Sequence, residues 1–164
     1  MGHLAWGRRL VLALVLPLLL PLGLTACAPG TPDGDSWRID AQRAVSDAAV
    51  QVHTAELALR LHDRGRVFDR YLQTVLVDAE RGVATAGDAV GSAQPPRAER
   101  ERYDSVTGQI DEAAGLVATV RIAVVDRETG RYDALADRLA DAASALVHLE
   151  EELQHPPVTQ GGSG

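Results

Sequence analysis

The stretch that decides the fold is YDSVTGQIDEAAGLVATVRIAV, residues 103–124. Its apolar side chains recur at alternating intervals of three and four residues, at Tyr103, Val106, Ile110, Ala113, Val117, Val120 and Val124. Because an α-helix completes a turn in about 3.6 residues, this spacing places all of them on one face. The same alternation is typical of helices that pack in a left-handed bundle. Residues 103–124 are therefore predicted to form a long helix with one buried face.

The segments around this stretch repeat the pattern. After Gly130 the predicted inward positions are Tyr132, Leu135, Leu139, Ala142, Leu146, Leu149 and Leu153. Between Ser36 and Gly65 they are Ala41, Ala44 or Val45, Ala48, Val52, Ala55, Leu59 and His62. From Val67 to Val90 they are Phe68, Leu72, Val75, Ala79, Val83, Ala86 and Val90. Further apolar residues are expected to widen the stripes of the last two helices toward more than one neighbour, namely Ile122, Val125, Ala143 and Val147.

Short breaks separate these segments, at Gly65, at 91–96 and at Gly130. Short connections favour antiparallel neighbours, so we expect an all-α, up-down-up-down four-helix bundle over residues 36–154. Residues 155–164, which begin with His155 and Pro156, are predicted to be a disordered tail.

The first 26 residues have the character of an export signal. A short basic start is followed by an apolar stretch, Leu10 to Leu24, that is short for a membrane-spanning helix. The stretch ends in Leu24-Thr25-Ala26-Cys27, which resembles the lipobox of bacterial lipoproteins. The resemblance implies diacylglycerol on Cys27, cleavage between Ala26 and Cys27, and a lipid anchor on the extracytoplasmic face of the cell membrane. An ordinary signal peptide with an incidental cysteine, or an uncleaved anchor, are the alternatives.

Residues 27–35 would then form a lipidated cysteine and a flexible tether, since 28–35 contain two prolines and two glycines. By general character the remaining chain is similar to small helical lipoproteins of actinomycetes, many of which have no assigned activity. That likeness carries over no functional residues.

Charge and composition narrow the class of partner. All 23 acidic residues follow Cys27 and two of the 16 arginines precede it, which leaves a formal net charge of −9 on the exported part. This balance argues against nucleic acid and against anionic headgroups as ligands. No nucleophile motif, phosphate-binding glycine pattern or histidine–carboxylate ligand set is present, so we expect neither an enzyme nor a cofactor or metal site.

A tethered N-terminus would leave the breaks near Gly65 and Gly130 at the end away from the membrane. That end carries the candidate partner-binding residues Arg64, Arg66, Tyr71, Arg127, Arg131 and Tyr132. The alternative is an ordinary solvated end whose arginines neutralise helix dipoles.

The sequence therefore predicts a membrane-anchored, non-catalytic helical interaction module that binds an envelope protein. The alternative is a small-ligand or metal carrier that uses the bundle core. Alanine- and glycine-rich stretches at 79–91 and 113–115 leave room for a ligand between helices, or allow close helix approach. A third possibility is a homo-oligomer that pairs two bundles through a leftover apolar stripe.

Overall fold

The computed structural model describes residues 34–155. The predicted signal peptide, the lipidation and cleavage sites at Ala26 and Cys27, the start of the tether and residues 156–164 of the tail lie outside this range. Within it, four long helices follow one another: α2 (Gly34–Asp63), α3 (Asp69–Ser92), α4 (Arg100–Val125) and α5 (Tyr132–Gln154). Short 3₁₀ turns, Arg97–Glu99 and Thr129–Arg131, precede α4 and α5. The described residues contain no strand, so the all-α class is confirmed.

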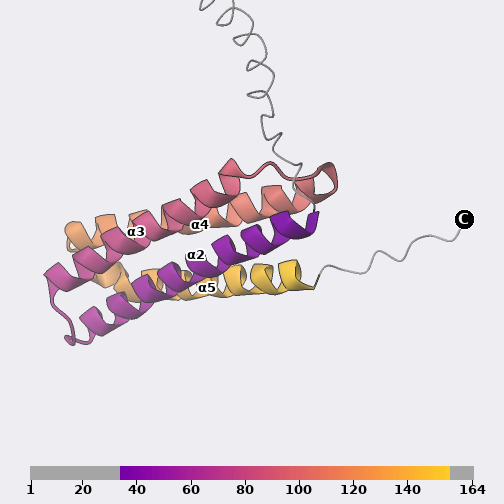
Figure 1. The fold of residues 1–164 in the computed structure, drawn as a ribbon. Coiled ribbons are helices and arrows are strands. Elements are labelled where there is room, and N and C mark those ends of the chain that lie inside the picture. Colours follow the sequence, from indigo (N-terminus) through magenta and orange to yellow (C-terminus); the bar gives the residue numbers. More distant parts are fainter. Residues whose placement is uncertain (1–33, 156–164) are drawn as a thin grey trace, which may run out of the picture. The chain divides into compact units, whose positions relative to one another are not determined.

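The helices pack lengthwise on one another (Figure 1). α2 lies between α3 and α5. The end of α2 contacts the beginning of α5, where the ring centroids of His62 and Tyr132 are 5.9 Å apart. The beginning of α2 contacts the beginning of α4 through Trp37 and Tyr103, whose ring centroids are 6.4 Å apart. None of the described helices is long and apolar enough to cross a membrane.

The predicted stripes of α4 and α5 form the core, as their spacing indicated. In α4 the stripe from Val106 to Val124 is buried, and Tyr103 packs against it from a partly exposed position. In α5 the stripe from Tyr132 to Leu153 is buried except for Ala142, which is partly exposed. Val117 and Leu139 are fully buried, so the interior between the helices is filled by aliphatic side chains.

Some predicted core positions are wrong. Phe68 is 86% exposed, because α3 begins only at Asp69 and Phe68 precedes it in an extended conformation. Leu76 is fully buried, while the predicted neighbour Val75 is only partly buried. Of the residues expected to widen the stripes, only Ala143 is buried. The others are exposed: Ile122, Val125 and Val147.

The two breaks at the α2–α3 and α4–α5 connections use the same helix-ending motif with different residues. After α2, the Arg66 amide donates to the Leu61 carbonyl and Gly65 has a φ of +66°. After α4, the Glu128 amide donates to the Ala123 carbonyl, and the left-handed residue is Arg127, with a φ of +57°. Such a position usually holds glycine. Gly130, which the sequence suggested as the break, lies in the following 3₁₀ turn.

A buried carboxylate joins the start of α2 to the start of α4. Glu99 is 6% exposed and accepts hydrogen bonds from Arg38 on α2, at 3.5 Å, and from Arg102 on α4, at 2.6 Å. Arg38 also pairs with Asp35. A buried charge is tolerated only when it is paired, and two guanidinium groups meet that need here.

Candidate functional site

The six candidate residues lie in two chain segments that we call the turn end: residues 60–71 and 126–133. The structure brings these segments together, since His62 contacts Tyr132 and the charge of Arg127 acts on Asp69. Five of the six candidates are exposed: Arg64, Arg66, Tyr71, Arg127 and Arg131. Tyr132 is 3% exposed and belongs to the core, so it supports this surface from below.

The support beneath the turn end is a small polar cluster. The Nε2 atom of His62 lies 2.8 Å from the Oδ1 atom of Asp69, which links the last turn of α2 to the first turn of α3. The His62 ring also stands edge-on to Tyr132. Its Nδ1 atom is buried without a hydrogen-bond partner among the described residues. This cluster fixes the α2–α3 connection against α5.

The cluster changes the acidity of two of its members. The hydrogen bond from His62, with the positive charges of His62 and Arg127, holds the pKa of Asp69 below its usual value of 3.8. Burial raises the pKa of Tyr132 above 10, and the nearby carboxylates of Asp69, Asp63 and Glu128 add to this effect. Near neutral pH Asp69 is therefore ionised and Tyr132 is a neutral phenol.

Above this cluster the α2–α3 connection presents an aromatic and cationic surface. Phe68 is the most exposed of the large apolar side chains described, at 86%, and Tyr71 is 55% exposed. Three exposed arginines lie close to them in the sequence and make no ion pair among the described residues: Arg64, Arg66 and Arg70. We call these five residues the α2–α3 tip. Phenylalanine, tyrosine and arginine are enriched in protein interfaces, and tyrosine and arginine also at their energetic centres.

Two of the other three arginines of the turn end are paired, and the third, Arg127, is exposed and makes no ion pair among the described residues. Arg60 pairs with Glu56 on its own helix and, at 3.0 Å, with Asp137 on α5. Arg131 pairs with Glu128. Among the described residues, the α2–α3 tip therefore holds three of the four unpaired arginines of the turn end, and Arg127 on the α4–α5 connection is the fourth.

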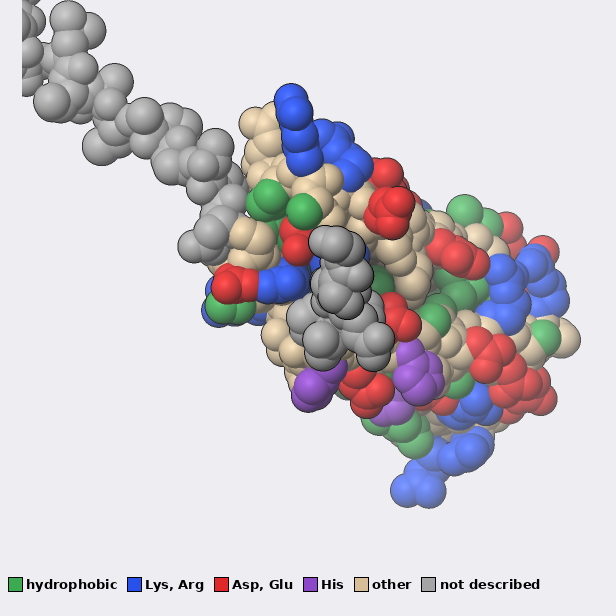
Figure 2. All heavy atoms as spheres, turned by 90° about the vertical axis from the view of Figure 1, so that its right-hand side faces the viewer, with side chains coloured by type: hydrophobic (Ala, Val, Ile, Leu, Met, Phe, Trp, Pro, Cys, Tyr) green, Lys and Arg blue, Asp and Glu red, His purple; other side chains and the backbone are tan. Residues whose placement is uncertain are grey.

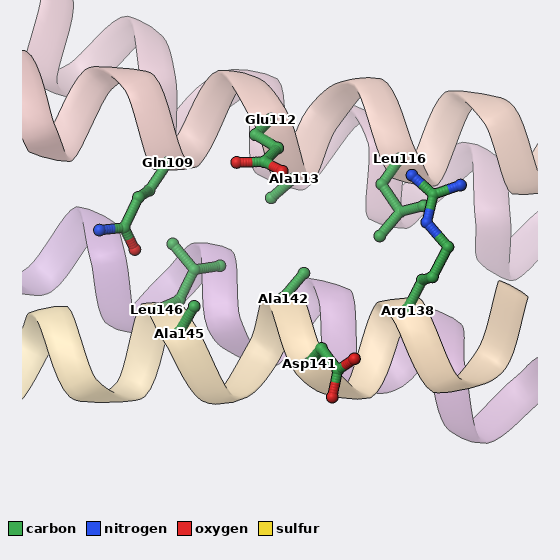
Figure 3. A pocket seen from close by; sticks show the side chains of 9 residues that line it. All are labelled: Gln109, Glu112, Ala113, Leu116, Arg138, Asp141, Ala142, Ala145 and Leu146. Carbon is green, nitrogen blue, oxygen red and sulfur yellow. The ribbon is translucent and has the colours of Figure 1, made fainter.

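A second feature lies between α4 and α5, away from the tip. A hollow of about 320 Å³ is bounded by apolar side chains from both helices, including Ala113, Leu116 and Leu146, with charged side chains at its edges (Figure 3). A second hollow of about 580 Å³ follows between the beginning of α4 and the end of α5. We call the two together the α4–α5 groove. Both lie at the surface between helices, whereas the carrier hypothesis places its ligand in the core.

The described residues contain no group of three or more His, Cys, Asp or Glu side chains arranged to hold a metal ion. The two buried carboxylates, Glu56 and Glu99, are each paired with arginine. On the end opposite the turn end, the visible face carries interspersed acidic and basic side chains (Figure 2).

Comparison of the chain with protein-family models, with curated proteins and with solved structures finds no match.

Proposed function

We propose that this chain is a membrane-anchored, extracytoplasmic lipoprotein that acts as a non-catalytic interaction module and binds an envelope protein through the α2–α3 tip. In this proposal the four helices run up-down-up-down in an antiparallel bundle, and diacylglycerol on Cys27 holds the N-terminal end at the membrane. The contacts of His62 with Tyr132 and of Trp37 with Tyr103 support that helix order. The turn end would then face away from the membrane.

The observation that carries the proposal is the exposure of Phe68. Leaving a phenylalanine in water forgoes about 1.5–3 kcal/mol of burial free energy. The chain nevertheless places this ring at a helix start, 86% exposed, between Arg66 and Arg70. The backbone beneath is held by the His62–Asp69 contact and by the left-handed turn at Gly65. A side chain on a backbone that is fixed in this way needs less ordering on binding than one on a mobile loop, which favours its use as an anchor.

The test is capture of the partner from intact membranes by the full chain after chemical crosslinking, with quantitative mass spectrometry. Phe68→Ser is the test variant and Val50→Ser the matched control, because Val50 is also an exposed apolar residue, at 58%, but lies on α2 away from the tip. Loss of an anchor residue lowers affinity by about 30-fold or more. We therefore expect Phe68→Ser to lose the captured protein and Val50→Ser to retain it.

The arginines are tested in the same way. Replacing Arg64, Arg66 and Arg70 with serine is compared with replacing Arg97 and Arg100, which lie at and just before the start of α4, are exposed and make no ion pair among the described residues. The proposal is wrong if no protein is captured specifically, or if tip and control variants lose it equally.

The anchor is tested separately with Cys27→Ser. We expect the wild-type chain to sediment with membranes and to carry the mass of diacylglycerol on Cys27, and the variant to lose both properties. An unmodified Cys27 in the membrane fraction would contradict lipidation without affecting the proposal for the tip.

A further inference from the structure

The α4–α5 groove consists of two hollows, both between α4 and α5. Its two hollows are lined from α4 over residues 101–116 and from α5 over residues 138–155. At 1.5 Å per residue, the α4 side extends for about 22 Å, which is the length of a helix of roughly 15 residues. Taken together, the two hollows thus cover a length that matches about four turns of another helix.

The floor of the groove is formed by apolar side chains, and some of the side chains along its walls are small. Leu116, Leu146 and Leu153 line it at buried positions, while Ala142 and Ala145 leave room above them. Gln109 projects from α4 into the gap between the helices (Figure 3). Its Oε1 atom is buried without a hydrogen-bond partner among the described residues. An unsatisfied buried acceptor destabilises the protein, and a donor from an incoming chain would relieve that cost.

The rim of the groove is acidic. Four exposed carboxylates line the two hollows and make no ion pair among the described residues: Glu101, Glu112, Asp141 and Glu152. Of the two arginines that line the hollows, Arg102 is held by Glu99, whereas Arg138 is exposed and makes no ion pair among the described residues, so four unpaired carboxylates face one unpaired cation. A rim of this charge attracts a cationic ligand and repels anionic headgroups. It also disfavours a second copy of this chain, whose part after Cys27 has a formal net charge of −9.

We propose that the α4–α5 groove docks one amphipathic helix of a partner protein, about four turns long, with an apolar stripe flanked by lysine or arginine. The stripe packs on the leucines of the floor, and the flanking cations face the rim carboxylates. Such helix-in-groove recognition uses anchor side chains spaced three and four residues apart. The site is separate from the α2–α3 tip and does not depend on the function proposed for that tip.

The test measures binding of designed 18-residue helical peptides to the full chain in nanodiscs of zwitterionic lipid, by fluorescence anisotropy. One peptide carries a leucine stripe flanked by lysines, and its matched partner carries the same stripe flanked by glutamates. Empty nanodiscs give the lipid background. We expect the lysine peptide to bind at least about tenfold more tightly than the glutamate peptide, with a difference that shrinks as salt is added.

Charge-reversal variants locate the binding. Glu112→Arg is compared with Asp111→Arg, the adjacent exposed carboxylate on α4, which does not line either hollow. We expect Glu112→Arg combined with Asp141→Arg to weaken the lysine peptide several-fold and to strengthen the glutamate peptide, which a folding defect would not do. Asp111→Arg and Phe68→Ser should leave both affinities unchanged, which separates this site from the tip. Ala145→Trp, which fills the groove, should abolish binding of either peptide.

Other outcomes overturn the proposal. Equal binding of the two peptides, or insensitivity to Glu112→Arg, would show that charge does not select the ligand. Tighter binding of a fluorescent fatty acid than of the lysine peptide would identify a lipid site. A dimer that Ala145→Trp dissociates would identify a second copy of this chain as the occupant. Failure of the lysine peptide to bind above the empty-nanodisc background would exclude the proposed docking.

Discussion

Arg127 offers a test of how α4 ends. It is the only described residue other than glycine with a positive φ, at +57°, and it occupies the position that Gly65 occupies after α2, where φ is +66°. We predict that Arg127→Gly stabilises the protein and that Gly65→Ala destabilises it. The two substitutions act on the same backbone conformation in opposite directions.

The magnitude follows from two opposing contributions. A left-handed conformation costs a residue with a Cβ roughly 1–2 kcal/mol. Glycine gives back roughly 0.4–1 kcal/mol of this because it makes the unfolded chain more flexible. The net change is about 0.5–1 kcal/mol in favour of glycine. At Gly65 the cost is conformational alone, since an added Cβ would meet no atom within 4 Å.

Arg127→Ala separates backbone strain from charge. Arg127 also acts electrostatically on Asp69, and both substitutions remove that interaction. The difference between Arg127→Gly and Arg127→Ala therefore reports the left-handed conformation. Urea unfolding of the full chain, followed by circular dichroism, should place the midpoint of Arg127→Gly about 0.25–0.5 M above that of Arg127→Ala, for an m-value of about 2 kcal/mol per M. Equal midpoints, or a Gly65→Ala variant as stable as wild type, would refute the reasoning.

Three further predictions use the same unfolding measurement. Leu139→Ala, at a fully buried position, should cost about 2–5 kcal/mol, whereas Val147→Ala, at an exposed position on the same helix, should stay within about 0.5 kcal/mol. Because His62 lowers the pKa of Asp69, this carboxylate should stabilise the folded state above pH 3.8, and that stabilisation should be lost as pH falls through the lowered pKa. Asp69→Asn should reduce this loss of stability at acid pH. Because burial raises the pKa of Tyr132 above 10, stability should fall as pH rises from 10 through the raised pKa, and Tyr132→Phe should remove that fall.

The stripes of α4 and α5 were predictable because nearly every inward residue follows one period. The first half of the chain was harder where two apolar residues are adjacent. Period alone does not choose between Val75 and Leu76, and the structure buries the larger one. Trp37 was missed as a core residue because it precedes the regular part of the α2 stripe, although it is almost fully buried.

The candidate surfaces were predictable only in part. The sequence pointed to the arginines of the turn end, but it placed Phe68 inside. The predicted helix begins at Val67 and α3 begins two residues later, at Asp69, so Phe68 precedes the helix and its side chain is exposed. The sequence also counted Tyr132 as a surface residue, although the same residue opened the predicted inward stripe of its helix. The rim of the α4–α5 groove depends on the spacing between two helices, and no local pattern encodes that spacing.

The hydrogen bond between Arg38 and Glu99 also affects how the protein responds to a pulling force. These residues are 61 positions apart, so the bridge clamps the first turns of α2 to the middle of the chain. For a pulling force to unfold α2 from its N-terminal end, the Arg38–Glu99 hydrogen bond must break and Trp37 must leave its buried site. Part of that force is transmitted to α4, because Arg102 donates a hydrogen bond to the other oxygen of the Glu99 carboxylate. A protein tethered at that end would resist tension where the tether pulls on it.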